Sequence, residues 1–326
     1  MSERPSENAG AKNPSPPQTE IRRPTRLRAL ALYLIAAAGL TACSLLLPDG
    51  IGMAGANLIY YGLFFAVPVA LTMRKTGIEA FRPNPISLRG MIAVILLAMN
   101  GVLFADNVTV LWAIPFQKLG LNVDAVSVAV PTNARGLVVS ILIVAVLPAV
   151  CEEFLFRGAI LSAFEANGTR YAILFSTVLF ALLHGSLIGL PAQFIVGLII
   201  AFVVVCTDSV YAGVIYHTVH NAASLIMQFV QQRSITPEDA QVTDYFTAIG
   251  GVGGIFTLLV EMILGAAVML MLLRLFRMRA MLRKVPIQPE NRAPLKISEW
   301  AVLLGAAVCI AGLYITDVWM MLGGGA

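Results

Sequence analysis

The stretch Leu137–Gly158 reads LVVSILIVAVLPAVCEEFLFRG, and it places two adjacent glutamates and an arginine at the end of a long apolar run. The run before Glu152 has the length and composition of a helix that crosses a lipid bilayer. Ionisable side chains inside a membrane are costly and by default mark a functional site. The stretch therefore predicts a membrane-spanning helix that carries part of such a site.

The whole chain has the composition of a multi-pass membrane protein. Of its 326 residues, 58% are hydrophobic and 12% are charged, whereas soluble domains carry about 25% charged residues. Roughly 20 apolar residues span the hydrocarbon core. The candidate spans are 29–47, 54–73, 91–114, 136–156, 171–183, 191–207, 211–230, 251–276 and 297–321. We expect an all-α transmembrane bundle of about eight to nine spans, surrounded by membrane lipid and without a nucleic-acid partner.

The cations are distributed unevenly between the two ends of the predicted helices. If the N-terminus is cytoplasmic and the spans alternate, all but three of the 22 lysines and arginines lie inside. The exceptions are Lys118, Arg135 and Arg233. This asymmetry predicts a multi-pass protein with a cytoplasmic N-terminus, in the plasma (inner) membrane if the source is bacterial.

The domain organisation follows from the same composition. Residues 1–27 are polar and predict a disordered cytoplasmic tail. Residues 28–276 form the transmembrane bundle, 277–296 a basic cytoplasmic linker, and 297–326 a C-terminal transmembrane helix.

The two adjacent glutamates cannot share one helical face. Glu153 and Arg157 are four residues apart and face each other on a helix, whereas Glu152 is rotated by about 100°. The simplest interpretation makes Glu153 and Arg157 a buried ion pair and leaves Glu152 for chemistry. In the alternative, the pair is a purely structural lock and Glu152 reaches the membrane interface.

Three histidines and an asparagine follow on two later apolar segments. His184 ends one segment, with Phe180 one turn before it. His217 and Asn221 lie one turn apart, and His220 shares part of their face, so geometry does not choose between the two histidines. An imidazole and a carboxamide on one face can stabilise the oxyanion of a tetrahedral intermediate. They can equally be hydrogen bonds between helices.

Two chemistries remain open for this constellation. Glu152 and His184 could activate water directly. Alternatively, Glu152, His184 and His217 could hold Zn²⁺, which accepts nitrogen and oxygen ligands and leaves a position for water. The sequence has no local zinc motif of the H-E-x-x-H kind. The cofactor is therefore open between Zn²⁺ and none.

These motifs, in this order and on separate membrane segments, resemble the CPBP family of intramembrane proteases, which includes type II CAAX prenyl endopeptidases and bacteriocin-processing proteins. They stand as Glu152-Glu-Phe-Leu-Phe-Arg157, Phe180-Ala-Leu-Leu-His184 and His217-Thr-Val-His-Asn221. The resemblance covers about residues 136–230, which we interpret as the protease core.

The resemblance implies a role for each matching residue. Catalytic roles fall on Glu152, His184, His217 and Asn221, the first two activating water and the last two holding the oxyanion. Supporting roles fall on Glu153 and Arg157, and we add Phe180 and His220 as helical neighbours of the catalytic histidines. Members of the family are described both as metalloproteases and as metal-free glutamate-dependent enzymes. Eukaryotic relatives remove the last three residues of prenylated CAAX proteins.

The sequence thus predicts an intramembrane endopeptidase that cuts a membrane-associated or lipidated protein or peptide, in a cavity open to the cytoplasmic side. One alternative is a transporter or proton relay that uses the buried Glu/His chain, with Asp106 and Glu261 as further relay points. Another is a non-catalytic immunity or binding protein of the same family. No role is predicted for Asp317.

Overall fold

The computed structural model describes residues 22–123, 131–234, 244–282, 288 and 293–324. Within these ranges the regular structure is helical, apart from one isolated antiparallel bridge between Pro83 and Ser209. This confirms the all-α fold class. Most of the predicted tail, part of the linker and two loops lie outside the described residues.

Each predicted span corresponds to a helix or a helical rod in the described part of the chain. The uninterrupted helices are α1 (Arg26–Leu46), α4 (Leu88–Lys118), α8 (Thr169–Leu183), α9 (Leu190–Thr207), α10 (Val210–Ser234), α12 (Gly251–Leu282) and α13 (Ile297–Met321). One rod consists of α2 (Gly52–Ile59), η2 (Tyr60–Ala66) and α3 (Val67–Thr76). The other consists of α5 (Ala134–Ser140), η4 (Ile141–Val146), α6 (Leu147–Glu153), η5 (Phe154–Leu161), α7 (Ser162–Phe164) and η6 (Glu165–Asn167).

Short elements complete the described chain: η1 (Asp49–Ile51), η3 (Ile78–Phe81) and α11 (Tyr245–Ala248). The middle segments η2, η4 and η5 are π-helical. Such segments are rare and are often found at functional sites. Two of them, η2 and η5, flank the glutamates described below.

Among the described residues, seven helices or rods are long and apolar enough to cross a membrane. They are α1, the α2–α3 rod, α4, the α5–η6 rod, α9, α12 and α13. Helix α8 has only 15 residues, and α10 has the length but carries polar side chains along one face. Both helices supply residues to the candidate site described below. The short length of α8 and the polar face of α10 therefore belong to that site.

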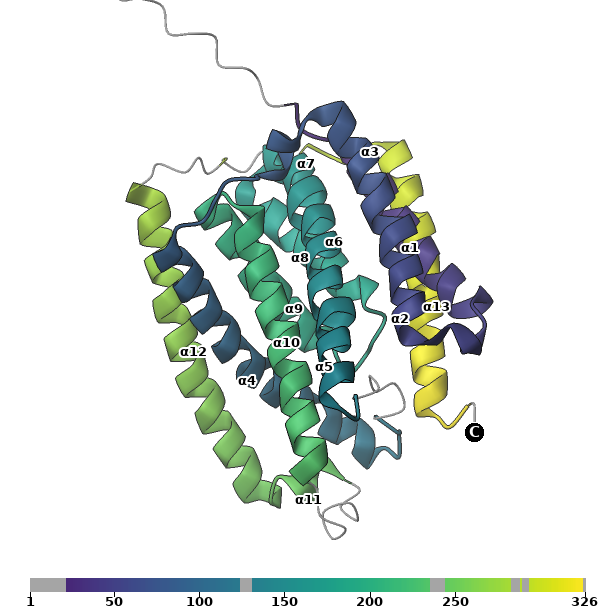
Figure 1. Ribbon diagram of the computed structural model, residues 1–326, viewed down its shortest axis with the longest axis vertical. Coiled ribbons are helices and arrows are strands. Elements are labelled where there is room, and N and C mark those ends of the chain that lie inside the picture. Colours follow the sequence, from purple (N-terminus) through teal and green to yellow (C-terminus); the bar gives the residue numbers. More distant parts are fainter. Residues whose placement is uncertain (1–21, 124–130, 235–243, 283–287, 289–292, 325–326) are drawn as a thin grey trace, which may run out of the picture.

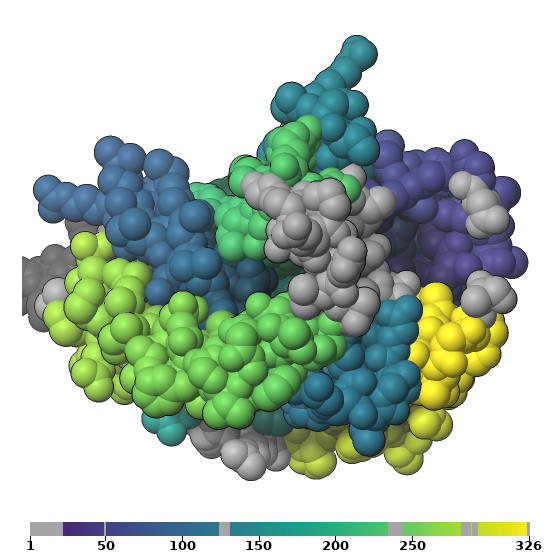
Figure 2. Space-filling model, turned by 90° about the horizontal axis from the view of Figure 1, so that it is seen from below, coloured from purple at the N-terminus to yellow at the C-terminus, as the bar shows by residue number. Residues whose placement is uncertain are grey.

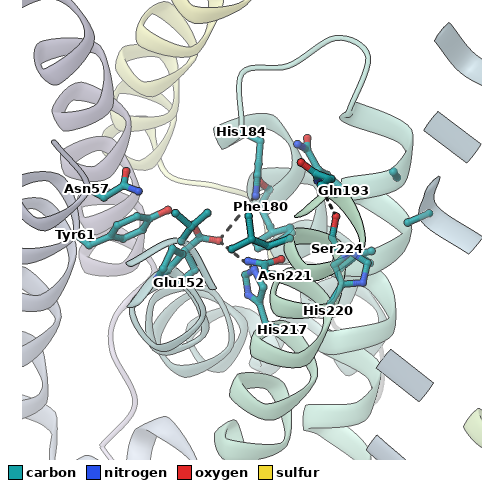
Figure 3. Close-up of a pocket in the computed structure, with 17 residues that line it drawn as sticks. Asn57, Tyr61, Glu152, Phe180, His184, Gln193, His217, His220, Asn221 and Ser224 are labelled. Carbon is teal, nitrogen blue, oxygen red and sulfur yellow. Dashed lines mark hydrogen bonds and ion pairs between the residues drawn. The ribbon is translucent and has the colours of Figure 1, made fainter. Parts of the chain in front are cut away.

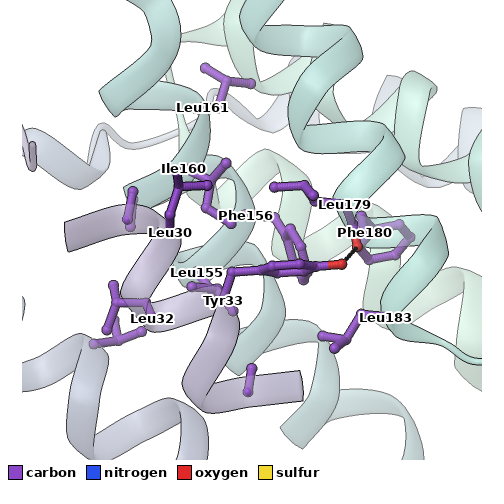
Figure 4. Packing of buried hydrophobic residues seen from close by; sticks show 14 of the residues in the cluster. Leu30, Leu32, Tyr33, Leu155, Phe156, Ile160, Leu161, Leu179, Phe180 and Leu183 are labelled. Carbon is purple, nitrogen blue, oxygen red and sulfur yellow. Dashed lines mark hydrogen bonds between the residues drawn. The ribbon is translucent and has the colours of Figure 1, made fainter. Parts of the chain in front are cut away.

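The helices pack into two groups that meet at the α5–η6 rod. The first group joins α1, η2, η5, α8 and α13 around a core that includes Tyr33, Phe156 and Phe180. Within it, the Tyr33 hydroxyl donates to the carbonyl of Leu179 over 2.9 Å (Figure 4). The second group joins α4, α9, α10 and α12. Figure 1 shows α12 along one edge of the molecule and α13 along the other.

The cations gather at one end of the bundle, as their pattern in the sequence predicts. We call this end, at the top of Figure 1, the basic end; among the described cations it carries Arg26, Lys75, Arg89, Arg170, Arg279 and Lys296. The opposite end carries Lys118, Arg135 and Arg233. Seen from the opposite end, α13 in yellow lies beside α1 in purple, with α12 in green on the far side (Figure 2).

An ion-pair network holds the connections at the basic end. The Arg82 guanidinium lies 2.5 Å from Glu165 and 3.2 Å from Asp208, and Arg23 also pairs with Glu165 at 2.7 Å. Arg82 and Asp208 are the described non-glycine residues with positive φ, at 57° and 50°. Such conformations persist only where the surrounding structure fixes them. The network therefore fixes the position of the start of α10 relative to the end of the α5–η6 rod.

The N-terminal boundary differs slightly from the predicted one. Helix α1 begins at Arg26, after the N-cap Thr25, rather than after residue 27. Arg26 pairs with Glu299 at 3.0 Å and donates to the carbonyl of Ala293. These contacts attach the first helix to the last, which packs along it. The C-terminal helix is consequently part of the first helix group and not a separate appendage.

Candidate active site

The three sequence motifs meet around one cavity of about 460 Å³ (Figure 3). Glu152 comes from α6, His184 is the C-cap of α8, and His217 and Asn221 come from α10. All four predicted catalytic residues line the cavity. Residues that are separated by up to about 70 positions in the sequence thus share one site.

Glu152 is the central group of this site, and its two oxygens have different surroundings. Oε1 accepts a hydrogen bond of 2.7 Å from the hydroxyl of Tyr61. Oε2 lies 4.0 Å from Nε2 of both His184 and His217, and it has no hydrogen-bond partner. The residue is only 5% exposed. A buried carboxylate oxygen without a partner is expensive, and this one faces the cavity where a reactant can bind.

Each imidazole is oriented by a hydrogen bond at its other nitrogen. His184 Nδ1 lies 2.8 Å from the carbonyl oxygen of Phe180, which can only accept, so Nδ1 carries the proton. His217 Nδ1 lies 3.0 Å from Glu153 Oε1. That carboxylate also accepts from Arg157, so His217 Nδ1 is likewise the donor. In the neutral rings, both Nε2 atoms therefore direct a lone pair toward Glu152.

Glu153 and Arg157 form the predicted buried ion pair. Arg157 Nη1 donates to Glu153 Oε1 over 3.0 Å, and neither side chain has any exposed surface. Arg157 Nη2 donates to the carbonyl of Gly197 over 2.8 Å. The pair does not serve only to neutralise two buried charges, because the same carboxylate oxygen of Glu153 also accepts a hydrogen bond from His217. Sequence spacing within one helix could not indicate this contact between helices.

Phe180 packs against both catalytic imidazoles. Its ring centroid lies 4.7 Å from that of His184 and 5.6 Å from that of His217, in edge-to-face arrangements. The Arg157 guanidinium lies over the same ring at 4.5 Å. A Cβ atom at position 197 would come within 2.8 Å of this ring, so glycine is needed there for the close approach of α9. Phe180 thereby fixes both histidines and closes the site toward Arg157.

The structure separates the two histidines between which helix geometry did not choose, and it places them as the resemblance implies. Only His217 of the two reaches Glu152, whereas the His220 ring is stacked on Tyr216 with centroids 6.1 Å apart. His220 lines the cavity, but its Nδ1 has no hydrogen-bond partner. Asn221 lies one turn beyond His217 and also faces the cavity (Figure 3).

Tyr61 is a site residue that sequence reasoning missed. It lies in η2, more than 90 positions before Glu152 in the chain, and its residue type alone carries no signal. Asn57, Gln193, Ser224 and Gln228 also line the cavity. Of these, Ser224 and Gln228 could have been found, because they continue the helical face of His217 and Asn221.

Asp106 and Glu261, which we considered as relay points, do not line the cavity, and neither does Asp317, for which no role was predicted. Glu261 accepts a hydrogen bond of 3.0 Å from Asn107, and Asp317 accepts one of 2.8 Å from the backbone of Leu187. Neither they nor Asp106 belong to its lining. In the part of the chain that the structure describes, these acids therefore lie outside the lining that Glu152, His184 and His217 share.

The donor set of Glu152, His184 and His217 suits zinc in its chemistry but not in its spacing. Second hydrogen bonds like those of the two rings are typical of metal-bound histidines. However, two ligands of one tetrahedral Zn²⁺ are about 3.3 Å apart, and here both separations from Glu152 Oε2 are 4.0 Å. Among the described residues, no group of three or more such side chains could hold an ion.

The lining of the cavity extends away from the basic end. It continues along α10 to Gln228, whereas the buried Glu153, Arg157 and Phe180 lie on the side of the basic end. Phe180 packs against both histidines and fills the space between them and the Arg157 guanidinium. The opening of the cavity to the cytoplasmic side stays a prediction.

Together, the fold and the site define a multi-pass helical membrane protein with a buried glutamate–histidine centre. Residues 134–223 match the sequence model of the family described as type II CAAX prenyl endopeptidase Rce1-like. The match runs from the start of α5 into α10 and contains every motif residue, which confirms the predicted resemblance. The match covers 90 of the 326 residues, so through this segment the chain is similar to CAAX-type intramembrane proteases. No curated protein and no solved structure matches the chain.

Proposed function

We propose that the protein hydrolyses a peptide bond inside the bundle, with Glu152 as the general base. The observation that carries this proposal is the buried, unpartnered Oε2 of Glu152, which faces a cavity between two oriented imidazoles. General bases need such a position within reach of the proton that they remove. The family match supports peptide hydrolysis as the reaction class.

In the proposed first step, a water molecule binds between Glu152 and His184. The Nε2 lone pair of His184 accepts one hydrogen bond from this water, and Glu152 Oε2 removes the other proton. The resulting hydroxide attacks the carbonyl carbon of the substrate, and the carbonyl becomes an oxyanion. The amide N–H groups of Asn221 are available to stabilise this oxyanion.

His217 can join Asn221 as an oxyanion donor only in its doubly protonated form. Its Nδ1 proton is already directed to Glu153, so donation from Nε2 requires a second proton on the ring. The Glu153 carboxylate then balances the positive charge, as the aspartate of a serine-protease triad does. In the last step, protonated Glu152 gives its proton to the nitrogen of the tetrahedral intermediate and the C–N bond breaks. The products are an amine and a carboxylic acid, which then loses its proton to solvent.

The experiment that tests this function compares newly formed protein termini in membranes from cells with the wild-type chain and with Glu152→Ala. We expect a set of termini that depends on the wild type, at equal membrane levels of both chains. Identical sets of termini, with the biological role of the chain retained by the variant, would instead indicate a non-catalytic binding or immunity protein. A chelator arm reports on metal dependence separately.

Tyr61→Phe is expected to lower kcat about tenfold and to leave KM unchanged. The hydroxyl fixes the Glu152 carboxylate by a 2.7 Å hydrogen bond, and such a bond to a charged group contributes about 1.5–3 kcal/mol. Tyr60→Phe is the matched control. Its ring lies 4.9 Å from that of Tyr61, but the hydroxyl that donates a hydrogen bond to Glu152 is that of Tyr61. An equal loss of kcat in both variants would show that the effect is one of packing.

A further inference from the structure

The part of the cavity beyond the catalytic residues has a lining of its own. Amide and hydroxyl side chains alternate there with small apolar ones. The polar residues are Asn57 from α2, Gln193 from α9, and Ser224 and Gln228 from α10. The apolar residues are Ala105, Val144, Pro148, Ala192, Val196 and Leu225.

The polar residues of α10 form a straight stripe. His217, Asn221, Ser224 and Gln228 follow one another at spacings of four, three and four residues, which places them on one helical face. At 1.5 Å per residue, the stripe is about 16 Å long. This equals the length of about five residues of extended chain. The stripe runs from the catalytic centre toward the opposite end of the bundle.

The polar side chains around the stripe have few partners within the protein. Gln228 donates to Ser224 over 3.2 Å, and Oε1 of Gln193 is buried without any partner. Asn57 and Asn221 line the cavity without a protein hydrogen bond in the described part of the chain. Amide groups in an apolar bundle require partners, and amides match the N–H and C=O groups of an unfolded peptide backbone.

The lining contains no lysine or arginine among the described residues. The sequence motifs include one arginine, Arg157. Its guanidinium is fully buried, pairs with Glu153 and donates a hydrogen bond to the carbonyl of Gly197. At the opposite end, Lys118 lies 3.5 Å from Asp244, and Arg233 donates to the carbonyls of Phe229 and Thr132. Arg135 is exposed at the start of α5 and does not line the cavity. A free carboxylate in this cavity would therefore lie near Glu152 without a cation to balance it.

From the stripe and the missing cation we infer the substrate class, and this inference rests on the proposed function. The cavity takes an uncharged internal segment of a protein, extended over about five residues, which enters from the end of the bundle opposite the basic end. The amides of the stripe pair with its backbone, and the small apolar residues accept its side chains. The cavity does not select a free C-terminal carboxylate close to the cleaved bond.

The test uses the purified full-length protein in detergent and two matched libraries of internally quenched ten-residue peptides. Both libraries contain only Gly, Ala, Ser, Val and Leu. In the first, the C-terminus is amidated, and the fluorophore and the quencher lie on either side of the middle bond of the peptide. In the second, the bond between the fluorophore and the quencher is followed by three residues that end in a free C-terminal carboxylate. We expect kcat/KM to be at least tenfold higher for the first library.

Two variants of α10 test the stripe itself. Gln228→Leu removes its last amide and should raise KM several-fold for the ten-residue amidated peptides, but not for five-residue ones that end before it. Gln231→Leu is the matched control, because Gln231 is exposed and does not line the cavity. An equal effect of Gln228→Leu on both peptide lengths would overturn the assignment of the stripe.

The outcomes separate this inference from the proposed function. Faster cleavage of the free-carboxylate library, abolished by Glu152→Gln, would overturn the substrate class while the proposed reaction stands. Cleavage that persists in Glu152→Gln, or no cleavage of either library by the wild type, would contradict the proposed reaction and the inference together. Preference for the amidated library, lost in Glu152→Gln, supports both.

Discussion

Glu152→Gln is expected to lower kcat by about 10³-fold or more, with little effect on folding. General-base catalysis contributes about 10²–10⁴-fold, and glutamine cannot accept the proton of the attacking water. The substitution keeps the shape of the side chain and an oxygen that can accept from Tyr61. It also removes a buried carboxylate whose Oε2 has no hydrogen-bond partner. The loss should therefore appear in the chemical step and not in stability.

The measurement is single-turnover cleavage of a quenched peptide together with thermal unfolding in detergent. Glu165→Gln is a suitable control, because Glu165 is a buried acid at the basic end that pairs with Arg23 and Arg82, away from the cavity. We expect it to lower the unfolding temperature and to leave kcat close to the wild-type value. Wild-type kcat in Glu152→Gln would show that another group activates the water.

The helices of this fold were predictable because each one crosses an apolar solvent. The segment that became α4 is a single apolar run, which length and composition predict as 91–114. The helix itself is slightly longer, Leu88–Lys118. Likewise, Glu153 and Arg157 are four residues apart on one helix, so their pairing at 3.0 Å could be predicted from spacing. Contacts within one helix depend on the spacing of the residues along the chain, so they can be predicted from the sequence.

The contacts between helices could not be predicted in the same way. Nothing in the sequence places Tyr61 against Glu152, because the relative rotation of η2 and α6 depends on the packing of the whole first helix group. The choice of His217 over His220 depends similarly on the rotation of α10. That rotation is set by packing against α4 and α9 and by the Arg82–Asp208 pair at its start.

The position of the cavity shows the same limit. The distribution of cations predicts which helix ends lie together, but it says nothing about where the bundle is filled. Phe180 is one aromatic residue among 16 phenylalanines in the sequence. Only its contacts with both imidazoles and with Arg157 show that it closes the site on the side of the basic end.

Glu153→Ala is expected to reduce both stability and activity, for two separable reasons. The substitution leaves the Arg157 guanidinium fully buried without its counter-ion, and breaking a buried pair in this way costs about 3–5 kcal/mol of unfolding free energy. It also removes the acceptor of His217 Nδ1, so the imidazole loses its fixed orientation toward Glu152. A purely structural pair would produce only the first effect.

The double variant Glu153→Leu/Arg157→Met separates the two effects. Replacing a buried ion pair by apolar residues of similar size is often neutral for stability or stabilising, so much of the lost unfolding free energy should return. Activity should not return, because His217 still lacks its acceptor and the charge that would balance its doubly protonated form. The measurements are unfolding in detergent and kcat at a temperature where all variants are folded. Recovery of kcat along with stability would show that Glu153 serves only Arg157 and that His217 needs no partner.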